Sequence, residues 1–358
     1  MEALKGLILS GGAGTRLRPI THTSAKQLVP VANKPVLFYG IEALVAADIT
    51  EIGIVIAPET GDEIRDAAGD GSAFGASITY IPQERPLGLA HAVLTAEDFL
   101  GDSPFVMYLG DNLLRDGINA LVDAFREHEP EALILLTRVP DPWHYGVAEL
   151  DGGRVTRLVE KPKDPPSDMA LVGVYMFTPA IFQAARAIEP SWRDELEITD
   201  AIQQLIDGGN RVESHTVSGW WKDTGQLADM LEANRLVLED VERRMDGNAD
   251  SESRVEGRVA IEAGAKLERS VVRGPAIIGA GARVVDSYVG PYTSLDRDVE
   301  IIGSEVEHSL LLAGASVRDL ETRIEASLLG RNVSLSRTHE MPKTLRMIVG
   351  DNSQVRIP

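Results

Sequence analysis

The stretch LKGLILSGGAGTRLRP, residues 4–19, joins an apolar run to a glycine-rich turn that is followed by basic residues. Further apolar runs follow, with helix-length segments between them: IGIVIAP from Ile52, ITYIPQ from Ile78, FVMYLGD from Phe105 and ALILLTRV from Ala132. Continuous apolar strands that alternate with helices are typical of a parallel sheet covered on both faces. We therefore predict a doubly wound, mostly parallel α/β domain, whose ligands bind beyond the carboxyl ends of its strands.

Composition and charge exclude several classes of function. The chain has 358 residues, a formal net charge of −20 and no cysteine. A length of this size favours two domains, at ~150 residues each. The lack of cysteine excludes disulfides, thiol catalysis and thiolate-bound zinc. The negative charge argues against nucleic acid or an anionic membrane as partner. The apolar runs are shorter than the ~18 residues of a membrane span, and no signal-peptide pattern is present, so we expect a cytoplasmic protein.

A second pattern begins near residue 255, where aliphatic residues recur at every sixth position. Its members are Val255, Ile261 and Leu267, then Ile278 and Val284, then Val289, Leu295 and Ile301, and later Leu311 with Val317 and Leu329 with Leu335. Small residues lie between them, as in IEAGAK (261–266). This hexapeptide periodicity predicts a parallel β-helix. We expect the slips in phase at 267–278 and 284–289 to be turns or short loops.

The two patterns set the predicted domain boundaries. The polar stretch RMDGNADSESR, residues 244–254, separates them and predicts a linker. We expect an α/β domain over 1–243, which ends in a helix from Gln226 to about Val241, and a β-helix over 255–358. The C-terminal segment 341–358 is expected to cap the open end of the β-helix. We assign the β-helix to assembly, which predicts a homo-oligomer.

The glycine-rich turn predicts a phosphate site. Gly11, Gly12 and Gly14 allow a tight turn that directs successive amide N–H groups at one point. Arg16 adds a guanidinium fork suited to a di- or triphosphate. The loop lacks the ending of a Walker A motif and the third glycine of a dinucleotide fingerprint. Alone it fits an ordinary strand-to-helix turn equally well, but SAKQLVPVANKP (24–35) supplies Lys26 and Gln27 directly downstream.

Together, GGAGTRLRPIT (11–21) and KQLVPVANKP (26–35) resemble the sugar nucleotidyltransferase family, and within it the glucose-1-phosphate thymidylyltransferases. The β-helix makes the chain similar to the long form of that family. The resemblance implies a Rossmann-like catalytic domain followed by a left-handed β-helix. It also implies that a sugar 1-phosphate, here glucose 1-phosphate, attacks the α-phosphorus of dTTP to give dTDP-glucose and pyrophosphate with the help of Mg²⁺.

Two aspartates stand where strands are expected to end. Asp111 closes FVMYLGD, and Asp223 lies in WWKDTG (220–225). Taken alone, each fits a helix or turn cap at least as well as a metal ligand, whereas the resemblance assigns both to Mg²⁺. We expect Lys26 to contact the phosphates at the reaction centre and Arg16 to lie beside the leaving pyrophosphate. No general base is required, because a phosphate monoester is already ionised at neutral pH.

Base recognition is predicted in IPQERPLGLAHA, residues 81–92. The Gln83 amide can pair with the N3–H and O4 edge of a pyrimidine, and Gly88 allows a close approach to the backbone. His91 stands where the family usually has glutamine, and we interpret it as a surface or packing residue. The predicted nucleotide-binding set is Gly11, Gly12, Gly14, Thr15, Arg16, Gln27, Gln83, Gly88 and Asp111.

The sugar phosphate is predicted to bind to four segments: HYGVAEL (144–150), VEKP (159–162), LVGVYMF (171–177) and WRDELEITD (192–200). Glu160 can accept hydrogen bonds from sugar hydroxyls, while Lys161 and Arg193 can hold the phosphate. Asp194 replaces a glycine that is usual in the family, and its carboxylate could compete for Arg193. The predicted sugar-phosphate set is Asn112, Tyr145, Gly146, Glu160, Lys161, Val172 and Arg193.

Three alternatives remain at this point. The same chemistry could use UTP or another sugar 1-phosphate, because contacts to the 5-methyl group and to the 2′ position are not visible in a sequence. A hexapeptide-repeat acyltransferase would need a histidine base, for which the β-helix half offers only His308 and His339. A non-catalytic homologue is expected to lack members of the catalytic set, yet all four are present. They are Arg16, Lys26, Asp111 and Asp223.

Overall fold

The computed structural model describes residues 3–12, 14–337, 349 and 351–356. The chain divides into two compact units. The first holds the described residues up to Gly12 together with Ser24–Leu28 and Val36–Asp223. The second holds Gly14–Thr23, Val29–Pro35 and the described residues from Thr224 onward. The segment that includes the glycine-rich turn therefore contributes to both units.

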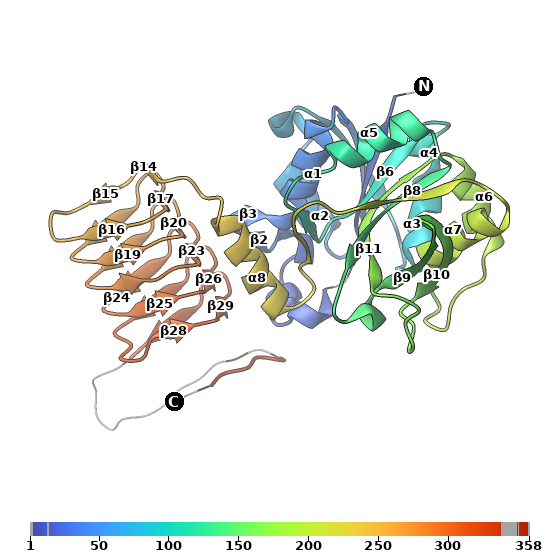
Figure 1. The fold of residues 1–358 in the computed structure, drawn as a ribbon. Coiled ribbons are helices and arrows are strands. Elements are labelled where there is room, and N and C mark those ends of the chain that lie inside the picture. Colours follow the sequence, from blue (N-terminus) through green and yellow to red (C-terminus); the bar gives the residue numbers. More distant parts are fainter. Residues whose placement is uncertain (1–2, 13, 338–348, 350, 357–358) are drawn as a thin grey trace. The chain divides into compact units, whose positions relative to one another are not determined.

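The first unit is built, in its described residues, on a nine-stranded sheet with the order β10-β9-β11-β6-β1-β4-β5, where β8 pairs with β11 and β12 (Figure 1). Its strands are β1 (Lys5–Ser10), β4 (Glu51–Ile56), β5 (Ser77–Pro82), β6 (Phe105–Leu109), β8 (Ala132–Arg138), β9 (Gly146–Asp151), β10 (Arg154–Glu160), β11 (Met169–Phe177) and β12 (Val212–Thr216). The five apolar runs predicted as strands are β1, β4, β5, β6 and β8, which confirms that expectation. Strands β5, β4, β1 and β6 are mutually parallel. Strand β11 runs antiparallel to both β6 and β8, so the parallel core has an antiparallel flank.

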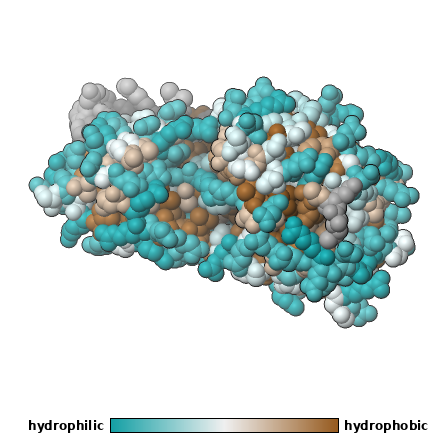
Figure 2. Space-filling model, turned by 90° about the horizontal axis from the view of Figure 1, so that it is seen from above, coloured by the Kyte–Doolittle hydropathy of each residue, from teal (hydrophilic) through white to brown (hydrophobic). Residues whose placement is uncertain are grey.

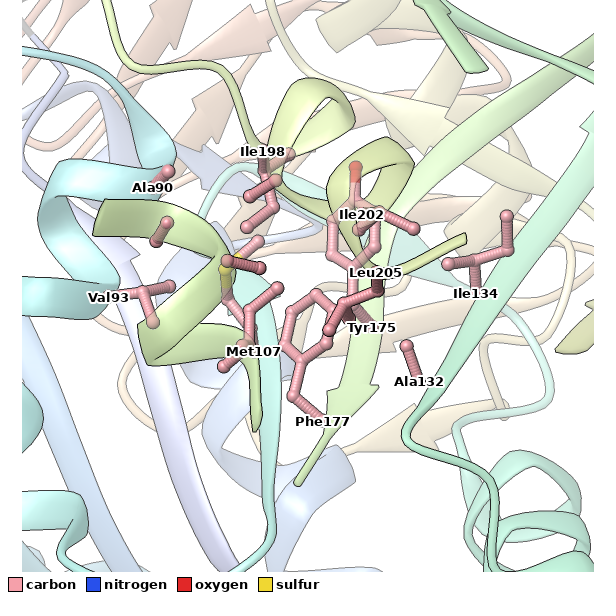
Figure 3. Close-up of a cluster of buried hydrophobic side chains, with 14 of the residues drawn as sticks. Ala90, Val93, Met107, Ala132, Ile134, Tyr175, Phe177, Ile198, Ile202 and Leu205 are labelled. Carbon is pink, nitrogen blue, oxygen red and sulfur yellow. The ribbon is translucent and has the colours of Figure 1, made fainter. Parts of the chain in front are cut away.

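Helices cover both faces of this sheet, as the alternating pattern predicts. They are α1 (Val36–Ala46), α2 (Gly61–Ala68), α3 (Leu89–Thr95), α4 (Glu97–Leu100), α5 (Asn119–His128), α6 (Ala180–Ala187) and α7 (Ile198–Asp207). Buried side chains of α3, α6 and α7 form one apolar cluster with the sheet, and those of α1, α2 and α5 form the other. Figure 3 shows the first cluster, in which Val93 of α3, Ile202 of α7 and Phe177 of β11 point toward one another. Burial of these side chains holds the strand ends in fixed positions.

The second unit contains, over its described residues, three sheets of short parallel strands, and in each sheet the strands of successive coils lie next to one another (Figure 1). One sheet comprises β14 (Arg244–Met245), β17 (Val259–Ile261), β20 (Ala276–Ile278), β23 (Thr293–Leu295), β26 (Leu310–Leu311) and β29 (Leu328–Leu329). The next comprises β15 (Asn248–Ala249), β18 (Lys266–Glu268), β21 (Arg283–Val285), β24 (Glu300–Ile302), β27 (Ser316–Arg318) and β30 (Ser334–Ser336). The third comprises β16 (Arg254–Glu256), β19 (Val271–Arg273), β22 (Tyr288–Val289), β25 (Glu305–Glu307) and β28 (Ile324–Glu325). This architecture is consistent with the predicted left-handed β-helix, and the aliphatic series fills its interior.

The predicted slips in phase have a common structural cause. Residues that pair between neighbouring coils from β16 to β24 are 17 positions apart, as for Val271 and Tyr288. Each of these coils has one corner where inward side chains are five rather than six residues apart, as between Leu267 and Val272. A buried serine occupies that corner, and its hydroxyl accepts the backbone N–H of the equivalent serine in the next coil. Ser270 accepts from Ser287 in this way, and Ser287 accepts from Ser304, both at 3.1 Å.

The stretch predicted as a linker, 244–254, is part of the β-helix. Strands β14 and β15 lie within it, and they pair with β17 and β18 of the following coil. These residues carry little apolar character because a terminal coil has a neighbour on one side only. The capping segment predicted at 341–358 lies mostly outside the described residues. The structure therefore does not test the predicted cap.

Helix α8 (Leu227–Leu238) occupies the range where a helix is predicted, and it belongs to the second unit. Its Asn234 is fully buried and links three parts of that unit. The amide oxygen accepts hydrogen bonds from Ala32 N at 2.9 Å and from Ser294 Oγ at 2.7 Å. The amide nitrogen donates to Tyr292 O at 3.0 Å. The hairpin of β2 (Pro30–Val31) and β3 (Lys34–Pro35) is held in the same unit, where Asn33 Nδ2 donates to Leu295 O at 2.6 Å.

Hydrophilic residues cover most of the face of each unit that is visible in Figure 2. No helix in the described part of the chain is long and apolar enough to span a membrane.

Candidate active site

A charged cluster lies at the carboxyl end of β6. Asp111 follows this strand after Gly110, and β7 (Asn112–Leu114) begins at the next residue. Strand β13 (Trp221–Asp223) pairs antiparallel with β7, which sets Asp223 opposite Asn112. The Lys26 ammonium contacts the Asp111 carboxylate and lies 3.7 Å from Oδ1 of Asp223. Two aspartates that are far apart in sequence thus meet at one lysine.

Lys26 is positioned by the turn that precedes it. It begins a 3₁₀ turn, Lys26–Leu28, whose Leu28 is buried in the cluster beneath α1. Glu63 on α2 holds the entry to this turn, because its carboxylate accepts hydrogen bonds from Ser24 Oγ at 2.7 Å and from Ala25 N at 2.6 Å. This anchoring limits the positions that the Lys26 side chain can reach.

The charges of the cluster favour an ionised Asp111. Burial acts to raise the pKa of this carboxyl, but the Lys26 ammonium and a hydrogen bond from Asn112 Nδ2 outweigh it, and the pKa lies below its usual range. Two carboxylates lie close to one ammonium here, and carboxylates of this kind can also attract a metal cation.

The donor set fits Mg²⁺. No group of three or more His, Cys, Asp or Glu side chains is arranged to hold a metal among the described residues. Asp111 and Asp223 nevertheless converge on one cationic nitrogen, so both carboxylates face the same point. Mg²⁺ is commonly bound by one or two carboxylates that are completed by substrate phosphates and water. The two aspartates match that requirement.

Two polar atoms beside the start of the glycine-rich turn have no protein partner. Oγ of Ser10 and Oε1 of Gln27 are buried, and neither forms a hydrogen bond within the described part of the chain. Nε2 of Gln27 lies 3.8 Å from the position that a Cβ on Gly12 would take. Because buried polar atoms are nearly always paired, these two mark a place where a ligand or water completes the bonding.

The remainder of the turn belongs to the second unit. Gly14 has a φ of 60°, which places it in the left-handed region that favours glycine. Thr15 and Arg16 begin the 3₁₀ turn Thr15–Leu17 and are exposed. Thr21 Oγ1 fixes this turn by donating to Gly14 O at 2.7 Å. Arg16 is therefore accessible to an anion, and its contact with a phosphate stays a prediction.

Gln83 lies buried just after β5, and its amide nitrogen is close to two polar atoms. Nε2 of Gln83 is 2.8 Å from Nδ1 of His91 on α3 and 3.4 Å from the carbonyl oxygen of Gly88. The amide oxygen faces Gly11, where a Cβ would lie 3.3 Å from it. The sequence interpretation of His91 as a surface or packing residue missed this contact.

Gly88 is required by its surroundings. Its φ is 106°, and a Cβ there would lie 2.3 Å from the carbonyl oxygen of Leu196. The backbone of the 87–90 segment is tied to Leu196 by hydrogen bonds in both directions, at 2.7 and 3.0 Å. Gly88 thus keeps the loop beside Gln83 in close contact with the segment that leads into α7.

The predicted sugar residues meet where β9 and β10 pair. Glu160 lies opposite Gly146, and a Cβ on Gly146 would lie 3.2 Å from Oε2 of Glu160. Lys161 N donates to Tyr145 O at 3.0 Å, while Lys161 Nζ is 3.4 Å from the Glu160 carboxylate. Burial raises the pKa of Glu160, and Glu197 adds to this effect while Lys161 opposes it.

Trp221 connects the sugar residues to the charged cluster, a role that the sequence analysis did not assign. Its ring meets Tyr145 edge-on with centroids 5.3 Å apart, and its indole N–H donates to Asn112 Oδ1. Asn112 in turn donates to Asp111 at 2.9 Å. The motif WWKDTG contained the only available signal, an aromatic pair just before Asp223.

In the part of the chain that the structure describes, Arg193 forms ion pairs with several carboxylates, but not with that of Asp194, which was expected to compete for it. Its guanidinium donates to Glu197 at 2.8 and 3.0 Å, and lies 3.0 Å from Glu195 and 3.4 Å from Glu160. Asp194 instead adopts a φ of 58°, a conformation that suits the glycine usual in the family. These contacts place Arg193 beside Glu160, as a shared sugar-phosphate site requires.

The side chain of Val172 lies in the apolar cluster beneath α1, so only its backbone can contact a substrate. The adjoining Gly173 lies close to the reaction side, because a Cβ there would be 2.9 Å from Nδ2 of Asn112. The predicted roles of the individual site residues otherwise stay predictions. The structure brings together most members of the set in the first unit.

A sheet with a parallel core and with charged side chains beyond its strand ends is compatible with an enzyme that transfers a nucleotide. The family model described as nucleotidyl transferase matches residues 5–240, and the chain belongs to this family.

Similarity to individual proteins extends over both units. The chain is 58% identical to a glucose-1-phosphate thymidylyltransferase of Streptomyces griseus, with 99% of each chain covered. It is 48% identical to a low-salt glycan biosynthesis nucleotidyltransferase of Haloferax volcanii, over 99% of this chain and 100% of the relative. Among solved structures, a putative glucose-1-phosphate thymidylyltransferase from Bacillus anthracis in complex with a sucrose matches with a TM-score of 0.63 at 36% identity. That match covers 68% of this chain and 98% of the other.

Proposed function

We propose that this protein is a glucose-1-phosphate thymidylyltransferase, which forms dTDP-glucose and pyrophosphate from dTTP and glucose 1-phosphate. One observation carries the proposal: relatives with this name are 57–58% identical to this chain over 99% of its length. The meeting of Lys26 with Asp111 and Asp223 supports it. Because these matches cover 99% of the chain, they include the β-helix.

The reaction requires two anions to meet in line, so positioning and charge neutralisation do most of the work. An oxygen of the sugar phosphate attacks the α-phosphorus, and the bond to the leaving pyrophosphate breaks. We assign the Lys26 ammonium to the α-phosphoryl oxygens, where it offsets the charge that develops. The phosphate of the sugar approaches already ionised, so no residue has to remove a proton.

The sugar phosphate is held, in this proposal, by the residues around β9 and β10. Lys161 and Arg193 supply the positive charge for its phosphate, and Glu160 accepts hydrogen bonds from hydroxyls. Tyr145 and Trp221 close the side of this site that leads to Asn112. Mg²⁺, held by Asp111 and Asp223 with phosphate oxygens, would supply Lewis-acid stabilisation of charge on the phosphates.

The β-helix is assigned to assembly rather than to chemistry. Its interior is filled by aliphatic side chains, and His308 forms an edge contact with Tyr292 at 6.3 Å between ring centroids. This packing role leaves no support for an acyltransferase base at His308. His339 lies outside the described residues. Assembly into a homo-oligomer and a cytoplasmic location stay predictions.

A panel assay tests the proposed function. Pyrophosphate release is measured for dTTP, UTP, dCTP and ATP, each against glucose 1-phosphate and galactose 1-phosphate in the presence of Mg²⁺. We expect the highest kcat/KM for dTTP with glucose 1-phosphate. A clear preference for UTP, or no release with any pair, would overturn the proposal.

A further inference from the structure

We infer that His91 is a specificity-determining residue, which orients the Gln83 amide so that the active site accepts a base with a ring N–H and rejects cytosine. The inference rests on the proposed function, and it concerns a residue that does not contact the reacting atoms. The geometry around the Gln83 amide carries it.

The groups around the Gln83 amide differ at its nitrogen and at its oxygen. Nε2 lies 2.8 Å from Nδ1 of His91 and 3.4 Å from the Gly88 carbonyl oxygen. The carbonyl can only accept a hydrogen bond, and a neutral imidazole accepts at Nδ1 when its proton is on Nε2. The carbonyl therefore calls for the amide NH₂ at this end, and His91 accepts from the same NH₂ in its Nε2–H tautomer, which directs Oε1 of Gln83 to the other side.

That other side is the glycine-rich turn. Oε1 faces Gly11, where a Cβ would lie 3.3 Å from this oxygen, so the lack of a side chain at Gly11 keeps the space beside Oε1 free of one. The buried atoms Ser10 Oγ and Gln27 Oε1 lie close to the same turn without a hydrogen-bond partner in the described residues, so a ligand or water completes the bonding there. The side chain presented to that ligand by Gln83 is consequently an acceptor.

An acceptor in this position discriminates between pyrimidines. Thymine and uracil carry a donor at N3, which pairs with Oε1, whereas N3 of cytosine is itself an acceptor and would face the oxygen. Reversing the amide would invert this preference, because Nε2 would then meet the base. A single hydrogen bond from Gln83 to His91 therefore couples a residue on α3 to the choice of nucleotide.

The surroundings of His91 keep its ring neutral. Burial lowers the pKa of His91 below its usual value of 6.5, and the charge of Arg85 lowers it further. Among the described residues, the ring interacts with Gln83 and Arg85 from the loop after β5 and with Thr95 from α3, and of these three only Arg85 is charged. Protonation would turn Nδ1 into a donor and would favour the reversed amide.

The test compares His91→Ala with His91→Asn, whose Oδ1 can restore an acceptor near the position of Nδ1. The readout is the ratio of kcat/KM for dTTP to that for dCTP, with glucose 1-phosphate as the second substrate. Loss of one neutral hydrogen bond predicts a fall of this ratio by roughly 3- to 10-fold in His91→Ala. His91→Asn should recover most of the ratio. His128→Ala, which removes an exposed histidine that contacts Glu213 on β12, is the matched control and should leave it unchanged.

The pH dependence of the same ratio is a second readout, which would not change if His91 had a purely structural role. The ratio in the wild type should fall as the pH is lowered through the depressed pKa of His91, while His91→Asn should show no such fall. An unchanged ratio in His91→Ala, or parallel pH profiles for wild type and His91→Asn, overturns the inference. If the wild type forms no dTDP-glucose at all, the proposed function fails instead, and the two failures are distinguishable.

Discussion

The sheet of the first unit and the coils of the β-helix both consist of parallel strands, but they treat polar side chains in opposite ways. In the β-helix, buried corner serines repeat the same backbone hydrogen bond from coil to coil. Its charged residues pair on the outside, as Arg269 does with Asp286. In the sheet, charged groups that differ from one another gather at the strand ends, where Lys26 meets Asp111 and Asp223.

This difference shows which part of a regular fold can form an active site. A repeated polar contact satisfies its own partners in each coil and offers nothing to a substrate. At the ends of β6 and β13 the chain brings side chains of opposite charge together, with two carboxylates close to one ammonium. Charged groups that a rigid core holds in one place can attract a charged ligand. The following predictions test this contrast.

Removal of a carboxylate from the charged cluster should have the largest effect. Asp111→Asn and Asp223→Asn should each lower kcat by ~10²-fold or more, because a preorganised group that stabilises charge is lost. The variants should retain the fold, as the substitution is nearly isosteric, and circular dichroism checks this. Asp286→Asn removes an ion-paired aspartate from the β-helix and should leave kcat unchanged. Near-normal turnover of both site variants with Mg²⁺ would contradict the assignment.

Removal of the sugar-phosphate lysine should harm one substrate selectively. Lys161→Ala should raise KM for glucose 1-phosphate by a factor of ~10 to 150, the loss expected for a charge-assisted hydrogen bond. KM for dTTP should stay nearly constant, because the nucleotide residues lie on other segments. Lys163→Ala removes an exposed lysine two positions away and serves as the control. Weaker dTTP binding with an unchanged KM for glucose 1-phosphate would mean that the VEKP segment binds the nucleotide and not the sugar phosphate.

Interruption of the serine ladder should affect stability and not chemistry. Ser287→Ala leaves the buried N–H of Ser304 without its partner and should lower the free energy of unfolding by about 1 to 3 kcal/mol. Urea denaturation measures the change, and the kcat of the folded enzyme should be that of the wild type. Ser251→Ala, at an exposed position, should change stability by no more than ~0.5 kcal/mol. Equal stability of the two variants would show that the ladder contributes nothing.

The smallest effect is expected at the backbone next to Arg193. Asp194 has a φ of 58°, so Asp194→Gly should raise the free energy of unfolding by about 0.5 to 1 kcal/mol through relief of the left-handed strain. Asp164→Gly, at an exposed position where φ is not positive, should give no gain. A loss of stability in Asp194→Gly would mean that the carboxylate makes a contact worth more than the strain.

Much of the architecture could be predicted because it depends on local patterns. The apolar runs at Ile52 and Phe105 predicted strands, and the six-residue spacing after Val255 predicted coils, since side-chain periodicity follows from backbone geometry. The same pattern also placed Asp111 at the end of a strand. The stretch 244–254 was predicted as a linker and not as a coil, because a terminal coil has few apolar residues that repeat.

The partners of the site residues could not be predicted in this way. Glu197, which holds Arg193, is four residues away on a turn whose path the sequence pattern leaves open. Asp223 lies opposite Asn112 only because β13 returns to pair with β7. Such contacts depend on the path of the chain between the two partners, and the periodicity of the sequence does not predict that path.

The amino-acid sequence by itself determined the class of fold, the two patterns of strands and the residue types that we expect at a nucleotidyl-transfer site. The tertiary structure decided which of those residues meet. It joined Lys26 to both aspartates, placed Trp221 between Tyr145 and Asn112, and set His91 against Gln83. The physical reason is range: strand and coil patterns arise from neighbours along the chain, whereas a charge or hydrogen bond acts across space, wherever packing brings its partner.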